Sequence, residues 1–349
     1  MAATSTYKGL SFWHDSLPEP LGRRPALPGD LDVDVAVVGA GYSGLWTAYY
    51  LAKADPGLRV AVLEREIAGF GASGRNGGWC SALFPASLEK VARVAAGGDR
   101  GGGDRGGGDP RAAAVALERA MQRTVDEVGR VAAAEGIDCH WAKGGTVSLA
   151  RTPVQLDRAK EHVAHARAWG FGDDDLRLLG PDEAGAMVNA TRVLGGTWTP
   201  HCAAIHPARL ARGLAAAVER LGVKLYEGTP VLEIQPGAVR TASGTVKAER
   251  IVRATEGYSP RLPGLRRAVA PVYSLMIATE PLPASTWERI GLASRPTFTD
   301  YRHLIIYGQR TADGRFAFGG RGAPYHFGSK IRPEFDREPA VFAELRRVL

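Results

Sequence analysis

The chain has 349 residues and a formal charge of +7, and 45% of its residues are hydrophobic while 23% are charged. This composition excludes an intrinsically disordered chain, and the length allows two or three domains with a sizeable core. No stretch offers the roughly 18 uninterrupted apolar residues of a membrane span, and residues 1–10 lack the pattern of a secretion signal.

The three cysteines, at positions 80, 139 and 202, are odd in number and lack the close spacing of a metal or redox motif. We therefore expect neither a disulfide framework nor a zinc site, as in a protein of the reducing cytoplasm. His201 and His206 flank Cys202, but no acidic residues accompany them, so a metal site is not expected there either. The arginines are scattered rather than clustered, which argues against nucleic acid as a partner.

The first ordered unit is expected after an N-terminal arm. The first thirty residues contain four prolines, and we expect an arm without regular structure of its own. The β-branched run 34–38 predicts a buried parallel strand, and a glycine-rich turn follows it directly. Residues 45–54 have helical spacing, and 59–63 predict a second buried strand that ends at Glu64.

The spacing of Gly39, Gly41 and Gly44 has a physical reason at each position. Gly39 permits the tight turn, Gly41 lets the backbone approach a pyrophosphate, and Gly44 lets the helix lie close to the strand. The helix start then presents N–H groups to the phosphates. Glu64 lies 20 residues after Gly44, where its carboxylate can accept from both ribose hydroxyls and would repel the 2′-phosphate of NADP. The unit predicts an adenine dinucleotide.

A second glycine-rich segment decides between FAD and NAD. An NAD dehydrogenase would continue with regular βα units, whereas residues 69–78 read GFGASGRNGG. Such a loop can wrap around a ligand, and Arg75 could meet the pyrophosphate. The alternative is a simple turn before a helix.

The rest of the chain alternates helices and short strands. Residues 97–109 repeat a GGGDR unit and predict a flexible surface insertion. Helices are expected over 111–135, 153–169 and 208–221. Strands are expected at 146–149, 223–226, 231–234, near 239 and 246, and at 251–252, 272–278, 304–307 and 316–318.

Five segments together resemble the FAD-dependent D-amino-acid oxidase superfamily, in particular its branch of gamma-glutamylputrescine and glycine or sarcosine oxidases. They are DVAVVGAGYSGLWTAYYLA, VLEREIAGFGASGRNGGWCSALFP, AIHPARLARGLAAAVERLGV, RATEGYSP and FAFGGRG. The resemblance implies an α/β fold with a glutathione-reductase-like, FAD-binding Rossmann domain (30–95 and 203–258). A second, mostly antiparallel α+β substrate domain would span 140–202 and 259–330.

The resemblance also implies an activity and a set of cofactor contacts. The activity is oxidation of the C–N bond of a small amine or amino acid, by hydride transfer to the flavin and hydrolysis of the imine, with O₂ or an electron carrier as acceptor. The implied contacts are Gly39, Gly41, Ser43 and Gly44 at the pyrophosphate, Glu64 at the ribose, Ser73, Arg75, Asn76, Gly77 and Gly78 towards the flavin, Val231 at the adenine, and Ala254, Thr255 and Glu256 closing over the nucleotide. Arg65 is a further candidate for cofactor binding.

Substrate contacts are expected after Pro271. Tyr273, Arg302, His303 and Arg321 are the candidates for catalytic roles, with Met276, Tyr301 and Tyr307 beside them. Arg302 or Arg321 would bind a substrate carboxylate. The alternative is that the tyrosines fill sheet faces and the arginines lie in water.

Members of the superfamily end with a further glycine-rich segment that returns to the cofactor, and no such motif follows Gly328. We therefore expect a truncated chain whose flavin site lacks part of its wall. Two other functions stay open, namely an FAD dehydrogenase that uses an electron carrier, and a catalytically silent fragment that binds nucleotide.

Overall fold

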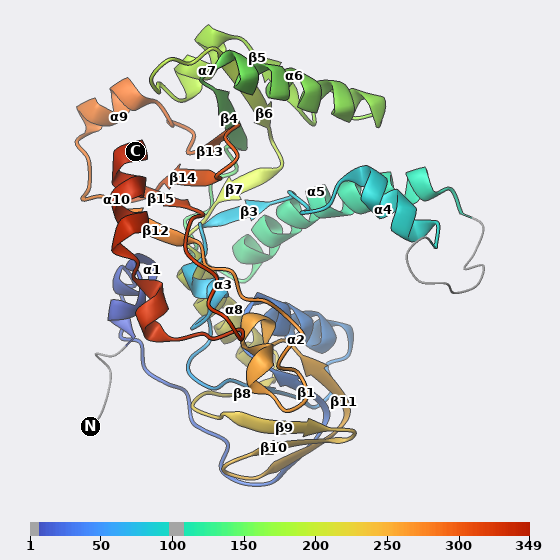
Figure 1. Cartoon of the computed structure of the whole chain (residues 1–349). Helices are drawn as coiled ribbons and strands as arrows, with labels where there is room; N and C mark the ends of the chain where they lie inside the picture. Colours follow the sequence, from blue (N-terminus) through green and yellow to red (C-terminus); the bar gives the residue numbers. More distant parts are fainter. Residues whose placement is uncertain (1–6, 98–107) are drawn as a thin grey trace.

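The computed structural model describes residues 7–97 and 108–349, and its two main sheets lie one above the other in Figure 1. The predicted insertion at 97–109 falls almost entirely outside these residues. The lower sheet has the strand order β8-β2-β1-β11-β10-β9, with the first four strands parallel and the last three forming an antiparallel meander. Its strands are β1 (Leu31–Val38), β2 (Val60–Leu63), β8 (Lys224–Tyr226), β9 (Val231–Gln235), β10 (Ala238–Thr241) and β11 (Thr245–Arg253).

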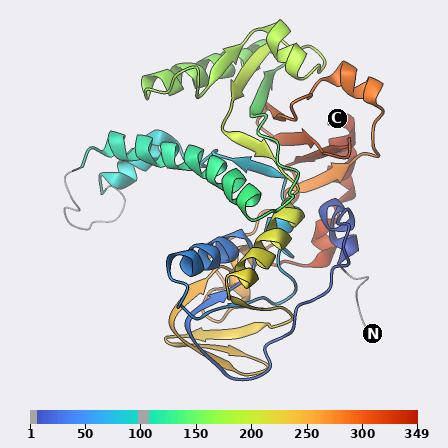
Figure 2. The ribbon, with the colours of Figure 1, turned by 180° about the vertical axis from the view of Figure 1, so that it is seen from behind.

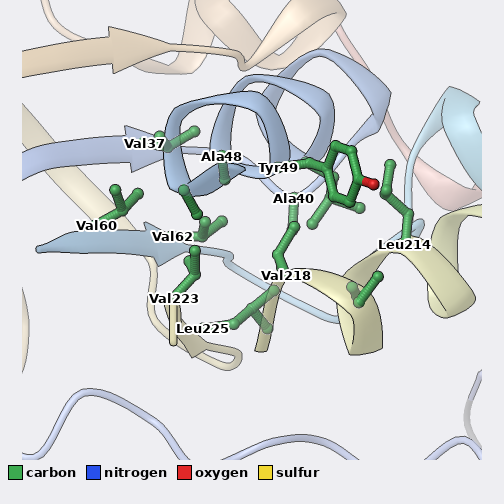
Figure 3. Close-up of a cluster of buried hydrophobic side chains, with 14 of the residues drawn as sticks. Val37, Ala40, Ala48, Tyr49, Val60, Val62, Leu214, Val218, Val223 and Leu225 are labelled. Carbon is green, nitrogen blue, oxygen red and sulfur yellow. The ribbon is translucent and has the colours of Figure 1, made fainter. Parts of the chain in front are cut away.

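Both faces of the parallel strands are covered, which explains their continuous apolar sequence. On one face, Val37 and Val62 pack beneath α2 (Tyr42–Ala54) and α8 (Pro207–Arg220), as Figure 3 shows. The alternate residues, Ala36 and Val38 among them, pack on the other face. From behind, α2 and α8 lie side by side over this sheet (Figure 2). The predicted strand–turn–helix–strand unit is therefore confirmed.

The upper sheet has seven strands in the order β12-β15-β14-β13-β4-β6-β5. All neighbours are antiparallel except β13 and β4, which run parallel. The strands are β4 (Thr146–Ala150), β5 (Arg177–Leu179), β6 (Gly195–Thr199), β12 (Leu275–Ala278), β13 (Thr297–Asp300), β14 (Ile306–Arg310) and β15 (Phe316–Gly320). The mixed α/β architecture agrees with the predicted fold class.

Short elements and helices connect the two sheets. A two-stranded ribbon of β3 (Trp79–Ser81) and β7 (Cys202–Ala204) lies between them, and the helices α4 and α5 extend to one side (Figure 1). The helices are α3 (Ala72–Arg75), α4 (Leu88–Ala95), α5 (Pro110–Ala134), α6 (Pro153–Ala168), α7 (Pro181–Met187), α9 (Ala284–Ile290) and α10 (Pro339–Val348), with 3₁₀ turns η2 (Glu256–Arg261) and η3 (Pro333–Asp336).

The expectation of an N-terminal arm without regular structure was wrong for its described part. Residues 7–29 contain the 3₁₀ turn η1 (Lys8–Leu10) and the helix α1 (Phe12–Asp15). Tyr7, Trp13, Leu17 and Leu21 are buried in a cluster that Phe70 of the second glycine-rich segment and Ala208 of α8 also join. The prolines break the segment into short pieces, but its apolar side chains still hold it against the fold.

Candidate functional site

The glycine turn after β1 leaves no room for side chains. Gly39 has a φ of 105°, and a Cβ there would stand 2.5 Å from the carbonyl oxygen of Ala254. A Cβ at Gly44 would come within 2.0 Å of the Gly39 carbonyl oxygen, so α2 starts this close to β1 only with glycine. At Gly41 a Cβ would stand 2.9 Å from Ser73 Oγ. The turn is thus a cradle that a larger residue would fill.

The start of α2 presents backbone N–H groups at this cradle. Gly41 is the N-cap residue and has no side chain to accept from them. The Tyr42 N–H donates to Ser73 Oγ at 2.8 Å. Ser43 and Gly44 follow in the first turn, where N–H groups have no acceptor within the helix. Such amides, together with the positive end of the helix dipole, suit a diphosphate.

Glu64 lies at the end of β2, half-buried beside this turn. Its carboxylate accepts from the N–H groups of Ala40 (2.8 Å) and Glu66 (2.9 Å). Burial raises the pKa of the Glu64 carboxyl, and the nearby charges of Glu227 and Glu66 raise it further. A carboxylate has about four acceptor sites, so two remain for ribose hydroxyls. Arg65, in contrast, is exposed and lies 3.5 Å from the Glu66 carboxylate.

Two segments distant in the sequence reach the same place. The Thr229 N–H donates to the Glu64 carbonyl oxygen at 2.8 Å, which brings the start of β9 at Val231 towards Glu64. Ala254 follows β11 and lies against Gly39, and Thr255 comes next in the chain. The structure therefore gathers the predicted pyrophosphate, ribose and adenine positions at the carboxyl ends of β1 and β2.

The second glycine-rich segment forms the loop 69–78, which we call the flavin loop after the role that the family resemblance implies for it. Asn76 fixes its shape, since its Oδ1 accepts from the Gly78 N–H at 2.8 Å and its Nδ2 donates to the Ser73 carbonyl at 3.0 Å. Trp13 on α1 donates from Nε1 to the Asn76 carbonyl at 2.9 Å. The N-terminal segment therefore supports the loop directly.

A glutamine that the sequence analysis missed joins the flavin loop to the upper sheet. Gln309 on β14 is fully buried, and its Nε2 donates to the carbonyl oxygens of Gly77 (3.0 Å), Gly78 (2.8 Å) and Ile205 (3.2 Å). Gly78 has a φ of 69°, and a Cβ there would stand 2.0 Å from Gln309 Nε2. Only a residue without a side chain permits this contact. No motif marks Gln309, because its role depends on distant partners.

Arg75 lies at the end of α3 and is partly buried. Its guanidinium forms an ion pair with Asp336 at 2.9 Å and donates to the Tyr258 hydroxyl at 3.3 Å. Its Nε is buried without a hydrogen-bond partner in the described part of the chain. The Nε–H of Arg75 is therefore an unused buried donor beside the flavin loop.

The ring of Tyr307 on β14 lies against the flavin loop. A Cβ at Gly77 would stand 2.7 Å from this ring, and one at Gly319 on β15 would stand 2.6 Å from it. The Tyr307 hydroxyl bonds with Ser274 Oγ at 2.8 Å. Burial raises the pKa of Tyr307, while the positive charge of Arg321 opposes this shift. The charge of Arg321 therefore acts on the Tyr307 hydroxyl.

Tyr273, just before β12, contacts aromatic side chains from the C-terminal part of the chain. Its hydroxyl is buried without a hydrogen-bond partner among the described residues, and its ring meets those of His326 and Phe335 edge-on. Burial and the charge of Asp336 raise its pKa. Met276, on β12, packs against the cluster around α1.

Three other candidates contact different partners. Arg302 donates from Nε to both carboxylate oxygens of Asp300, at 2.7 and 2.8 Å. His303 Nε2 lies 2.6 Å from Arg158 on α6, and the Tyr301 hydroxyl bonds with a histidine of the same helix. The charge of Arg302 is therefore already paired, which distinguishes it from Arg321.

A model of FAD dependent oxidoreductases, the DAO family, matches residues 34–349. The chain belongs to this family. It is 29% identical over 318 residues to a probable oxidoreductase OrdL of Haemophilus influenzae, covering 88% of this chain and 69% of that protein. It is 30% identical over 296 residues to gamma-glutamylputrescine oxidoreductase of Escherichia coli, covering 82% of this chain and 64% of the relative.

Solved structures agree on the fold. Glycine oxidase from Geobacillus kaustophilus matches with a TM-score of 0.64 and 24% identity, over 91% of this chain and 77% of that one. L-proline dehydrogenase from P. horikoshii matches with a TM-score of 0.61 and 19% identity, over 92% and 76%. The predicted family, the enzyme class and the cofactor FAD are therefore confirmed. The glycine cradle, the start of α2 and Glu64 fit its pyrophosphate and adenosine.

Two further findings concern the described residues alone. Within 7–97 and 108–349, no helix is long and apolar enough to cross a membrane. In the same ranges, no three histidine, cysteine, aspartate or glutamate side chains group together as metal ligands would.

Proposed function

We propose that this chain oxidises the C–N bond of a primary or secondary amine, or of an amino acid, and releases an imine that water hydrolyses. The names of two relatives, gamma-glutamylputrescine oxidoreductase and glycine oxidase, support this substrate class. FAD, when bound, supplies the acceptor for the hydride that leaves the carbon beside the nitrogen. The proposed cofactor domain is 30–95 with 203–258, the proposed substrate domain is 140–202 with 259–330, and the proposed location is the cytoplasm.

One observation carries this proposal, namely the joining of the flavin loop to the upper sheet by Gln309. The same strand, β14, carries Tyr307 two residues earlier, so the two side chains share one face. The upper sheet thereby presents a tyrosine hydroxyl at the loop that the family resemblance assigns to the flavin. A substrate between loop and sheet would meet this hydroxyl.

The hydrogen bonds around Tyr307 suit an amine substrate. Ser274 Oγ donates to the Gly320 carbonyl at 3.1 Å, so the Tyr307 hydroxyl donates its proton to Ser274 Oγ. The Tyr307 oxygen then keeps its lone pairs for an N–H group of the substrate. The tyrosine stays protonated at neutral pH because burial raises its pKa. In this role Tyr307 orients the amine.

Arg321 is the better of the two candidates for a substrate carboxylate. It is exposed, and no carboxylate lies within 4.0 Å of it in the described part of the chain, whereas Arg302 is held by Asp300. The positive charge of Arg321 would also favour the neutral form of a bound amine, which is the form that can lose hydride.

The test is an assay of the purified protein for flavin and for two kinds of turnover. We expect a yellow protein with close to one FAD per chain, and H₂O₂ release with amines or amino acids. Dye reduction without H₂O₂ would indicate a dehydrogenase that uses an electron carrier. Colourless protein that gains no activity when FAD is added would contradict the proposal and favour a silent fragment.

A further inference from the structure

A partly open cavity of about 150 Å³ lies beside the flavin loop, and its lining includes Trp13 and Gln309, which both hold that loop. Gly78 of the loop packs against Gln309 and Trp13, which both line the cavity. We call it the Arg295 cavity. The lining residues used below are Trp13, His206, Arg209, Arg295, Gln309 and Asp313.

The Arg295 cavity has an excess of positive charge. Arg295 donates to the carbonyl oxygens of Arg310 (3.0 Å) and His140 (2.9 Å), and no carboxylate of the described residues lies within 4.0 Å of it. Arg209 pairs with the exposed Asp138 at 3.0 Å, but its Nε is buried without a partner. The Asp313 carboxylate is already held by Arg315 at 2.8 Å. Two guanidinium groups therefore lack a full complement of acceptors.

The histidines at the cavity do not add charge. His206 Nδ1 accepts from the Arg209 N–H at 3.2 Å. Its Nε2 lies 3.0 Å from Ser16 Oγ, whose own proton goes to the Phe12 carbonyl at 2.8 Å, so His206 is the donor. Burial lowers the pKa of His206 to about 3 and also lowers that of His140. The positive charge is thus that of the arginines alone.

A buried acceptor in the wall lacks a donor. The three carbonyl oxygens around Gln309 Nε2 fix the orientation of the amide, so Oε1 must face the other way. This oxygen is buried and has no hydrogen-bond partner among the described residues. A simple anion cannot satisfy it. Its partner must carry an N–H or O–H group.

Two residues of the wall also have unusual backbones. His140 and Arg295 have φ values of 54° and 53°, in the left-handed region that favours glycine. The Arg295 side chain holds the His140 carbonyl, so the two are directly linked. Strain of this kind gathers at ligand sites.

We propose that the Arg295 cavity binds a small carboxylate that carries a hydrogen-bond donor on the next carbon, such as a free α-hydroxy or α-amino acid of the size of glycolate or glycine. The carboxylate would lie on Arg295 and on Arg209 Nε, and the donor would face Gln309 Oε1. The volume suits a molecule of about five to ten non-hydrogen atoms. Since Gln309 also donates to the carbonyl oxygens of Gly77 and Gly78, binding in the cavity would affect the flavin loop. The proposal does not depend on the proposed function.

Calorimetric titration of the purified protein tests this, with glycolate and glycine as the probes and acetate and glycinamide as comparisons. We expect both probes to bind, acetate to bind at least threefold more weakly because it has no donor, and glycinamide not to bind. Arg295→Gln should weaken binding at least tenfold, and Arg295→Lys less. Arg250→Gln, an exposed arginine on β11, is the matched control and should bind as the wild type does.

Several outcomes would overturn the proposal. Absence of binding for all four compounds would mean that the cavity holds water only. If Arg321→Gln abolishes binding and Arg295→Gln does not, the probes bind near Tyr307 and not in the Arg295 cavity. If Arg295→Gln unfolds, as circular dichroism would reveal, Arg209→Gln takes its place, and unchanged binding in that variant counts against the site.

Discussion

The ring of Tyr307 fits so closely over Gly77 that a single methyl group on Gly77 would stand 2.7 Å from it. A Cβ at Gly319, the cross-strand partner of Tyr307, would likewise stand 2.6 Å from the ring. We expect Gly77→Ala to lower the free energy of unfolding by about 1–3 kcal/mol and to reduce the FAD content, since the loop or the ring must move. Urea unfolding and flavin absorbance measure both effects. In Gly185→Ala, where a Cβ meets nothing within 4 Å, neither quantity should fall.

Gln309→Leu tests the connection between loop and sheet. Leucine has a similar size but removes the side-chain donor of three carbonyl oxygens, and those of Gly77 and Ile205 lose it without replacement, whereas that of Gly78 still accepts from the Ile205 N–H. The free energy of unfolding should fall by about 2–3 kcal/mol, and FAD affinity should fall with it. The control is Gln235→Leu, an exposed glutamine on β9. An equal loss in both variants would argue against the connection.

Glu64→Gln tests the ribose site. Glutamine keeps one acceptor oxygen but puts an NH₂ group where the carboxylate accepts from a backbone N–H, so fewer acceptors remain for ribose. We expect FAD affinity to fall at least tenfold, which is about 1.4 kcal/mol. Fluorescence titration of apoprotein with FAD measures it. The control, Glu249→Gln on β11, should bind FAD as the wild type does. Unchanged FAD affinity in Glu64→Gln would show that the Glu64 carboxylate does not bind the ribose.

Acid should destabilise the chain in a window set by two buried histidines. Burial lowers the pKa of His14 to about 4 and that of His206 to about 3, from an ordinary value of 6.5. Below pH 6.5 these two histidines become protonated in the unfolded chain but stay neutral in the folded chain. The free energy of unfolding therefore falls as the pH drops towards 4. In His206→Gln this slope should decrease by up to about 1.4 kcal/mol per pH unit. Urea unfolding from pH 7 to 4 measures it, and an unchanged slope in His206→Gln would contradict the prediction.

Arg321 and Arg302 should differ in steady-state kinetics. If Arg321 binds a substrate carboxylate, Arg321→Met raises KM for amino acids by tenfold or more and leaves simple amines nearly unchanged. Arg302→Met should instead lower stability, since it leaves the buried Asp300 carboxylate without its partner. If instead Arg302→Met raises KM for amino acids and Arg321→Met lowers stability, Arg302 is the residue that binds the substrate carboxylate.

The cofactor half of the site could be predicted because its signals are local. The strand, the glycine spacing and Glu64 lie within one short segment, and each follows from backbone geometry. The ribbon of β3 and β7 was missed, since strands of three residues are defined by a partner distant in the chain. Gln309 and Glu227 were missed for the same reason. Glu227 is fully buried between Arg24 and Arg212, yet nothing near it in the sequence indicates this.

The support of the flavin loop by Trp13 and Gln309 bears on how the protein is made. A ribosome releases Trp13 and the loop early, but Gln309 follows Gly77 by 232 residues. The nascent chain can therefore complete its first βα unit while the wall of the loop is still being synthesised. Tight binding of FAD must therefore wait until β14 has left the ribosome. When flavin is scarce during growth, we expect the cells to accumulate full-length apoprotein that can still bind FAD, and not incomplete chains.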